Sequence, residues 1–441
     1  MTTAPTRETR WSIGLWGLVF VLSGNMLLDA LEVSVVIVAL PSIGHELLPS
    51  VGAVQWVMSG FAIGFGGLML FGGRVVARLG RRRVYLAALL GYAAMSLAGG
   101  LAGSALLLIA SRLVKGFCVA LTAPTGLSII STRFPDGPAR RRAMSIYTLF
   151  GASGFAVGLV LSGLLTQFAH WRWTFLFPAP VALVLFAFAA FLIPRDTGKP
   201  DPQRYDVAGA VTFLTGLCAL VYAITTGALV AYGVAIVSLA AFAAIERTTK
   251  QPLIQPKLLR NRALIRSSIG AATLNGSYWG FLFLSTLRLQ QTLHWPPLLT
   301  GLALIPASVL PALAAPFSGA MVARFGPARL IAAGAVPPVA GFVLALVTGA
   351  TVPALVLVGL GYVIAFAALH MQAISGVPAE DQSATTAVYQ TSVQIGGALA
   401  LALVAALLPA GYRPTMVLIT AISMAGLVVG LVGLVARADR S

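Results

Sequence analysis

Two carboxylates lie where charged groups are energetically unfavourable. Of the 12 Asp and Glu residues, only Asp29 and Glu32 lie deep inside a long apolar run. A charge at the centre of a bilayer costs from about 2.5 to above about 10 kcal/mol, so buried carboxylates there are candidates for function. Positions three apart share a helix face, so these two are expected to interact. Burial and a neighbouring like charge both favour a protonated carboxyl, which predicts a pair able to bind and release a proton.

Arg112 is the expected counter-charge for this pair, because it lies within another apolar run. Two interpretations remain open. Asp29 and Glu32 exchange protons as one coupled pair, or one of them forms a permanent bridge to Arg112 that only joins two helices. A further hypothesis is that a lipophilic cationic substrate binds the same carboxylates and competes with protons there.

The composition indicates that these residues lie on membrane-spanning helices. Of the 441 residues, 58% are hydrophobic and 9% are charged, whereas soluble domains carry about 25% charged residues. Apolar runs of about 20 residues, enough to cross a bilayer, recur along nearly the whole chain. We expect fourteen spans, at residues 12–40, 54–72, 84–100, 105–131, 145–166, 174–193, 207–225, 228–245, 267–290, 298–322, 328–349, 353–371, 385–408 and 414–435.

The spans predict an all-α membrane protein with three parts. Residues 1–193 form a six-helix bundle, residues 194–262 form a linker with an inserted two-helix hairpin, and residues 263–441 form a second six-helix bundle. A single central chamber between the bundles is expected to hold the ligand. We expect a monomer that contacts the lipid bilayer, a small-molecule substrate and protons.

The distribution of basic residues predicts the orientation, because short cytoplasmic loops are rich in Lys and Arg. If the N-terminus is inside, only Arg172 and Arg413 among the 29 Lys and Arg residues fall in outer loops. Arg112, Lys115 and Arg288 lie within expected spans, and the others lie on the inner side. We therefore expect a multi-pass protein of the bacterial cytoplasmic (inner) membrane with both termini cytoplasmic. This pattern also explains the net charge of +17 without a nucleic-acid partner.

Several other classes of function lack their residues. Cys118 and Cys218 both lie in apolar runs, so neither a disulfide framework nor a metal site is expected. There is no G-x-x-x-x-G-K-[ST] loop for ATP, and no cofactor is expected. A membrane-embedded enzyme is disfavoured because the histidines are scattered, at His45, His170, His294 and His370.

A short repeat links the two bundles. Residues 73–80 and 319–326 both follow the template G-x-x-V-A-R-x-G, and each occupies the equivalent place in its bundle. Internal repetition is typical of transporters built from two related halves, with the substrate site between them.

At these residues the chain resembles the major facilitator superfamily, and specifically its drug:proton antiporter branch with fourteen helices. Residues 31–41 resemble L-D-x-T-V-V-N-V-A-L-P, with Glu32 in place of Asp. Residues 73–82 resemble G-x-L-a-D-r-x-G-r-k, with Ala77 in place of the acid. Residues 112–116 resemble R-x-x-q-G, with Lys115 in place of Gln.

Two more matches lie in the fifth expected span and in the segment that follows it. Its small residues resemble the antiporter motif G-x-x-x-G-P-x-x-G-G without the proline, at Gly154, Gly158, Ser162 and Gly163. Residues 171–175 then match W-R-W-x-F. Small residues four apart also allow close helix packing, which explains the spacing without an antiport role.

The resemblance implies a secondary active transporter that works by alternating access. It favours proton-coupled efflux of a small lipophilic or cationic organic compound, such as a drug, an antibiotic or a secondary metabolite. It also favours Glu32 as the proton or cation site, with Asp29 as its partner and Arg112 as the counter-charge. A proton-coupled importer of a small solute remains the alternative, because the antiporter proline and the acid at Ala77 are missing.

Two further groups of residues are candidates. The basic loop at residues 73–83 is a candidate conformational latch that holds one state of the transporter. Alternatively, its arginines only fix the topology. The latch residues are Gly73, Arg78, Gly80, Arg81 and Arg82. Polar or amphipathic side chains on apolar helices are candidates for the substrate cavity, but for each one alone an interhelical hydrogen bond or an interfacial anchor is favoured over a ligand contact. They are Asn25, Gln55, Trp56, Asn275, Tyr278, Trp279, Tyr389, Gln390 and Gln394.

Overall fold

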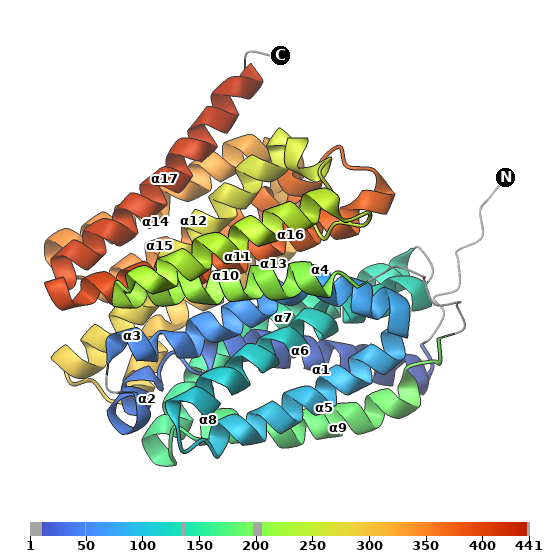
Figure 1. The fold of residues 1–441 in the computed structure, drawn as a ribbon, viewed down its shortest axis with the longest axis horizontal. Coiled ribbons are helices and arrows are strands. Elements are labelled where there is room, and N and C mark those ends of the chain that lie inside the picture. Colours follow the sequence, from blue (N-terminus) through green and yellow to red (C-terminus); the bar gives the residue numbers. More distant parts are fainter. Residues whose placement is uncertain (1–10, 49, 135–136, 197–204, 439–441) are drawn as a thin grey trace, which may run out of the picture.

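The computed structural model describes residues 11–48, 50–134, 137–196 and 205–438, and these residues are almost entirely helical (Figure 1). The tails and residues 197–204, on which part of the predicted charge pattern falls, lie outside the described residues. The N-terminal half contains the long helices α1 (Ile13–Ser34), α4 (Trp56–Leu79), α5 (Arg81–Gly100), α6 (Ala105–Arg133), α7 (Pro138–Phe168) and α9 (Pro178–Leu192). Short helices connect them, namely α2 (Leu40–Leu47), α3 (Val51–Val54) and α8 (Trp173–Leu176).

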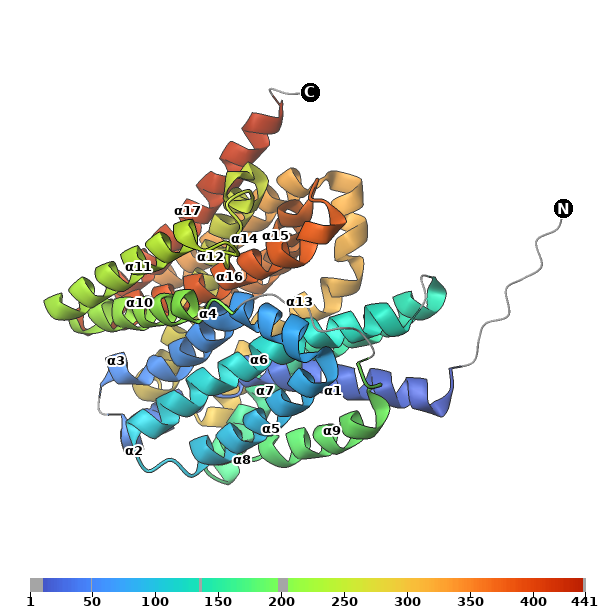
Figure 2. The ribbon, with the colours of Figure 1, turned by 45° about the vertical axis from the view of Figure 1, so that its right-hand side comes forward.

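A helical hairpin separates this half from the C-terminal half. The hairpin consists of α10 (Val207–Thr226) and α11 (Leu229–Thr248). The second half contains α12 (Arg262–Leu287), α13 (Pro297–Phe325), α14 (Pro327–Thr348), α15 (Thr351–Ile374), α16 (Ala379–Leu407) and α17 (Tyr412–Ala438). The two halves lie one above the other in Figure 1, and Figure 2 shows them as separate layers of helices.

Two helix pairs join the halves, because α4 packs against α16 and α7 packs against α13. Glycines bring the backbones close at both contacts. A Cβ atom at Gly66 would meet Gln394 Cβ at 2.5 Å, and one at Gly163 would meet Leu298 Cα at 2.9 Å. The hairpin lies beside this boundary, since α10 contacts both α4 and α16.

Twelve helices among the described residues are long and apolar enough to cross a membrane, so the predicted count of fourteen is not confirmed. The two long helices outside that set are α5, with 20 residues, and α12, with 26 residues. Three arginines begin α5. In α12, polar residues such as Asn275 and Ser277 are buried within the protein. The arginines of α5 and the polar residues of α12 lower the apolar content of these two helices.

The first expected span is shorter in the structure than residues 12–40. Helix α1 ends at Ser34, and residues 35–39 form a turn before α2 begins at Leu40. The turn has contacts between residues three apart, including Ile37 N–H to Ser34 O at 3.0 Å and Ala39 N–H to Val36 O at 3.1 Å. The β-branched run from Val35 to Val38 lowers helix propensity only slightly. Pro41, in the first turn of α2, lacks a backbone N–H and so cannot continue the preceding helix.

The sequence repeat has the same backbone geometry in both halves. Gly80 ends α4 and precedes α5 with φ +88°, and Gly326 ends α13 and precedes α14 with φ +78°. Glycine reaches positive φ with little steric penalty. The last glycine of G-x-x-V-A-R-x-G therefore makes the same tight turn twice.

Candidate functional site

The candidate proton pair lies between α1 and α6, inside the N-terminal half. Asp29 is 4% exposed, and Glu32, Arg112 and Lys115 are each 0% exposed. Asp29 and Glu32 are three residues apart on α1, and Arg112 and Lys115 are three residues apart on α6. The two helices therefore present two carboxylates to two cations, and the formal charges of the four groups cancel.

Both cations pair with Glu32. Arg112 forms an ion pair with one carboxylate oxygen, and Lys115 Nζ lies 2.7 Å from the other. The Tyr92 hydroxyl also donates to Glu32 Oε2, over 2.7 Å. Such pairing is what allows a charged group to remain buried. Glu32 thus joins α1 to α5 and α6.

Arg112 also fixes the ends of its guanidinium to the backbone. Its Nε donates to the Val57 carbonyl on α4 over 2.7 Å, and Nη2 donates to the Glu32 carbonyl over 3.3 Å. The guanidinium lies 4.6 Å from the Phe61 ring centre, and Lys115 Nζ lies 4.7 Å from the Tyr92 ring centre. Aromatic faces attract cations, so the rings stabilise this charge cluster in an apolar setting.

Asp29 has a different set of partners, all of them neutral. Asn25 Nδ2 donates to Asp29 Oδ2 over 3.0 Å, and the Thr122 hydroxyl donates to the same oxygen over 2.9 Å. Asp29 Oδ1 is buried and has no hydrogen-bond partner among the described residues. Asp29 is therefore the carboxylate of the pair without a bound cation within the described chain.

Three residues of this cluster were not predicted as site residues. Lys115 binds Glu32, Tyr92 donates to Glu32, and Thr122 donates to Asp29. For Lys115 the sequence held a usable signal, because it lies in an apolar run three residues after Arg112 and so shares its helix face. For Tyr92 and Thr122 the sequence gives no comparable signal, since tyrosines and threonines are common on spanning helices.

Three of the expected cavity residues form hydrogen bonds to neighbouring helices of the C-terminal half. Asn275 donates to the Val393 carbonyl over 2.9 Å and accepts from the Tyr362 hydroxyl over 3.3 Å. The Tyr278 hydroxyl donates to the Ala307 carbonyl over 3.2 Å, and the Tyr389 hydroxyl to the Phe366 carbonyl over 3.4 Å. These three residues belong to the C-terminal half.

The other cavity candidates are dispersed over both halves. Gln55 donates to Thr225 of the hairpin over 3.3 Å, and Trp56 lines an apolar groove against α10 and α11. Trp279 lies under Gly397, whose Cβ would meet the indole at 2.8 Å. The carbonyl oxygens of Gln390 and Gln394 are buried without a partner among the described residues. Within the described chain, Asn25 is the one member of the set with a recorded hydrogen bond to the charge cluster.

The small-residue motif of α7 packs against two different helices. A Cβ at Gly154 would meet the Leu27 carbonyl at 2.5 Å, and one at Gly158 would meet the Leu31 carbonyl at 2.8 Å, both on α1. Gly163 instead packs on Leu298 of α13, in the other half. Ser162 is buried beside Gly163. The motif therefore joins the helix of the carboxylate pair to the boundary between the halves.

The basic loop surrounds the turn at Gly80. The Arg82 backbone N–H donates to Asp196 over 3.1 Å, and Arg81 Nη1 donates to Thr132 over 3.2 Å. Arg78 lies over the Tyr205 ring at 4.5 Å. Gly73 has open space where a Cβ would lie. The carboxylate nearest the turn is thus Asp196, from the segment after α9, and Ala77 supplies none.

A second polar cluster lies at the opposite end of the N-terminal half. Trp171 Nε1 donates to Glu46 over 2.5 Å, and Arg172 Nη2 lies 2.7 Å from the other oxygen of the same carboxylate. Both contacts favour the ionised form, and the hydrogen bond from Trp171 is the larger cause of the lowered pKa of Glu46. The W-R-W-x-F segment therefore holds α2 against α8.

Helices of this length and number, two repeated halves and a buried charge cluster between helices together define a polytopic membrane transporter. The chain belongs to the Major Facilitator Superfamily, whose family model matches residues 22–401. This identifies it as a transporter and not an enzyme, in agreement with the prediction from sequence.

Curated relatives match over most of their length. The Puromycin resistance protein pur8 of Streptomyces alboniger is 34% identical over 417 residues, covering 89% of this chain and 81% of the relative. The Cephamycin export protein CmcT of Amycolatopsis lactamdurans is 31% identical over 90% of this chain and 85% of its own. The Multidrug efflux pump LfrA of Mycolicibacterium smegmatis is 28% identical over 93% of this chain and 83% of its own.

Among solved structures, the peptide transporter POT in complex with alafosfalin has the same fold. Its TM-score is 0.72 at 16% identity, and the match covers 98% of this chain and 96% of that one.

Proposed function

We propose that this chain is a proton-coupled exporter of small lipophilic or cationic organic compounds, such as drugs, antibiotics or secondary metabolites. Relatives with resistance and export in their names, at up to 34% identity over most of the chain, support the direction of transport. The proton coupling is supported by the buried carboxylates of α1.

The observation that carries the proposal is the difference between Asp29 and Glu32. Glu32 is bound by two cations, whereas the partners of Asp29 among the described residues are the neutral donors Asn25 and Thr122. Protonating Glu32 would leave two buried cations with one fewer partner, which is strongly unfavourable. Protonating Asp29 removes one unpaired buried charge. The contacts therefore favour Asp29 as the group that exchanges the proton, and the assignment of Glu32 to that role stays an untested prediction.

In this mechanism Glu32, Arg112 and Lys115 form a fixed centre next to the exchanging group. Protonation of Asp29 changes the total charge of the four groups from zero to plus one. A cationic compound is disfavoured near the cluster in that state and favoured when Asp29 is ionised. A proton and a cationic substrate therefore compete for the negative charge of Asp29. The exchange is completed when the chamber opens to the other side of the membrane.

The closed contact between the halves supports alternating access. Gly163 meets Leu298 at the end of α7 that precedes the W-R-W-x-F segment, and Gln167 accepts from the Leu298 N–H over 3.0 Å. Gln290 Nε2 donates to the Val38 carbonyl over 2.8 Å at the same end. The halves are thus held together on the side expected to be outer, and in each transport cycle these contacts open. The basic loop at Gly80 acts as the latch on the inner side.

The finer topology is also part of the proposal. Helices α5 and α12 cross the membrane as well, which gives fourteen spans with both termini in the cytoplasm of a bacterial cell. Helix α5 packs between α6 and α9, and α12 packs against α15, α16 and α17. Both therefore pack against apolar helices, and arginines at a helix end or polar groups that face the bundle interior are tolerated in a spanning helix. The protein acts as a monomer in this scheme.

The test of coupling is transport in inverted membrane vesicles with an imposed pH gradient, with a fluorescent lipophilic cation as the reporter. The Asp29→Asn variant is expected to abolish gradient-driven uptake into these vesicles and to weaken binding of the cation, because a neutral Asn gives the cluster the same charge as protonated Asp29. Glu380→Gln is the matched control, because Glu380 is exposed at the start of α16. Undiminished gradient-driven flux in Asp29→Asn would refute the proton role, and flux in the opposite direction would favour import.

A further inference from the structure

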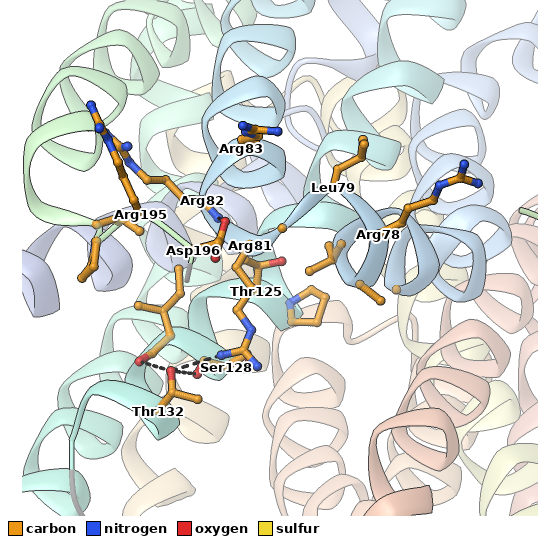
Figure 3. A pocket seen from close by; sticks show the side chains of 18 of the residues that line it. Arg78, Leu79, Arg81, Arg82, Arg83, Thr125, Ser128, Thr132, Arg195 and Asp196 are labelled. Carbon is orange, nitrogen blue, oxygen red and sulfur yellow. Dashed lines mark hydrogen bonds between the residues drawn. The ribbon is translucent and has the colours of Figure 1, made fainter. Parts of the chain in front are cut away.

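A large basic cavity lies at the expected inner end of the N-terminal half, away from the charge cluster of α1. Its volume is about 1080 Å³, and it lies among the end of α4, the start of α5, the end of α6 and the segment after α9 (Figure 3). A single residue of the other half, Ser383 on α16, also lines it. The lining residues come almost entirely from the N-terminal half.

The cavity contains many more cations than anions. Its lining includes six arginines and one carboxylate, Asp196. The arginines are Arg78, Arg81, Arg82, Arg83, Arg133 and Arg195. Figure 3 shows Arg81 reaching across to Thr132, while Arg82 and Arg195 lie on the side of Asp196.

The recorded partners of these guanidiniums are mainly neutral. Arg82 Nη2 donates to the Ala190 carbonyl over 2.5 Å, and Arg82 Nε is buried without a partner among the described residues. Arg81 Nη1 donates to the hydroxyl of Thr132 over 3.2 Å. Asp196 receives the backbone N–H of Arg82 rather than a guanidinium. Guanidinium donors therefore remain available to an anion.

The start of α5 adds further positive potential. Arg81, Arg82 and Arg83 are the first three residues of this 20-residue helix, and its first turn has no acidic residue. A helix N-terminus carries a partial positive charge, so three cations there are mutually unfavourable unless an anion lies nearby. Among the described residues, Asp196 provides one negative charge for the helix end and for six guanidiniums. A further anion in the cavity would therefore be electrostatically favourable.

The remaining lining suits an anion with an apolar extension. Hydroxyls of Thr125, Ser128 and Thr132 lie along one wall, and apolar side chains, including Ile129 and Ile193, lie beside them. Phosphate matches the planar donor fork of arginine. The Thr125 and Thr132 hydroxyls already donate to backbone carbonyls, whereas the Ser128 hydroxyl has no recorded acceptor among the described residues and can donate to a phosphate. A phosphate group with carbon attached satisfies both kinds of lining.

We propose that this cavity binds the phosphate group of an anionic molecule, either the headgroup of an acidic phospholipid or a free phosphate compound. The arginines at the start of α5 and Arg195 hold the phosphate, and the wall of α6 contacts the remainder. Occupancy neutralises the first turn of α5 and links the ends of α4, α5, α6 and α9. The proposal does not depend on the direction of transport or on the role of Asp29.

The test measures binding to the purified full-length protein in neutral detergent micelles. Three ligands are titrated separately: short-chain phosphatidylglycerol, short-chain phosphatidylcholine and inorganic phosphate. The variants are Arg81→Gln and Arg195→Gln, and the control is Arg324→Gln. Arg324 occupies the position of Arg78 in the sequence repeat and lies at the end of α13, outside the lining of the cavity. All three variants remove one positive charge.

Phosphatidylglycerol is expected to bind at least about tenfold more tightly than phosphatidylcholine, and each cavity variant to weaken it by about tenfold, as for loss of a charged hydrogen bond. The Arg324→Gln control is expected to bind as the unmodified protein does. Binding of phosphatidylglycerol without competition by phosphate identifies the lipid as the ligand, and competition by phosphate identifies the free anion. Equal binding of both lipids without a phosphate effect, or equal weakening by Arg324→Gln, overturns the proposal.

Discussion

The Thr122 hydroxyl donates to Asp29 over 2.9 Å and so connects α6 to the carboxylate that lacks a bound cation. The same pair of helices holds Glu32 between Arg112 and Lys115 about one turn away. Two carboxylates on one helix face are thus given different partners by one neighbouring helix. This difference makes separate roles possible for groups that the sequence could treat only as a pair.

Replacing Thr122 is expected to change the pH dependence of transport. In Thr122→Val, Asp29 loses one of two donors to its ionised form, so its proton is released less readily and the pH profile of transport moves to higher pH. A lost hydrogen bond to a charged group is worth about 1.5–3 kcal/mol, so the change in the profile should be measurable. Transport measured across a pH series tests this. Thr122→Ser keeps the hydroxyl and is expected to retain the original profile, and an unshifted Thr122→Val profile would contradict the role of this bond.

Removing Lys115 alone is expected to destabilise the protein, because one cation of a charge-balanced buried cluster is lost. A broken buried pair costs about 3–5 kcal/mol. Lys115→Gln should therefore lower the thermal unfolding midpoint, and so should Glu32→Gln. The double variant restores neutrality, since it removes one charge of each sign. The double variant is expected to lower the unfolding midpoint by less than the sum of the two single losses. Strictly additive losses would show that the two side chains do not interact.

The pair at Glu46 predicts a pH dependence outside the membrane spans. The pKa of Glu46 is lowered, first by the hydrogen bond from Trp171 and also by Arg172. A carboxyl whose pKa is depressed on folding stabilises the fold above its ordinary pKa of about 4.3, and this contribution is lost as the pH falls through the lower folded value. Unfolding midpoints of the protein and of Glu46→Gln should therefore differ near neutral pH and converge in acid.

The expected difference is small because Glu46 is partly exposed and exposed pairs contribute little. Glu380→Gln, an exposed carboxyl without a recorded ion pair among the described residues, serves as the control. A difference that grows as the pH falls would contradict the predicted sign.

Much of the fold followed from hydrophobic pattern, but the partners of the site did not. The runs at residues 105–131 and 207–225 appear as α6 and α10, and the repeat at Gly80 and Gly326 forms matching turns. Arg112, the expected counter-charge, lies in an ion pair with Glu32 of α1. That Glu32 and not Asp29 takes both cations depends on the relative rotation and depth of α1 and α6. Helical periodicity gives which residues share a face, but it leaves that rotation and depth undetermined.

The polar residues expected in a cavity show the same limit of what a sequence can predict. Asn275 and Tyr278 bond to backbone carbonyls of neighbouring helices. A sequence reveals that such a side chain needs a partner in an apolar setting, but a backbone carbonyl has no sequence signature. The distinction between a ligand contact and an interhelical bond therefore required the packing of α12 against its neighbours.

Gly158 is expected to set the distance between α7 and the helix that carries Asp29 and Glu32. A Cβ atom there would meet the Leu31 carbonyl at 2.8 Å and overlap the Ser34 hydroxyl. Gly158→Ala must therefore separate the helices, and overpacking of this kind costs about 1–3 kcal/mol. The matched control is Gly319→Ala on α13, where no atom lies within 4 Å of the added Cβ. We expect a lower unfolding midpoint for Gly158→Ala and an unchanged or raised one for Gly319→Ala, because alanine favours helix.

Because α1 would move relative to α6, gradient-driven transport should also fall in Gly158→Ala alone. Equal midpoints and equal transport in the two variants would show that the close approach of α7 to α1 does not position the carboxylates.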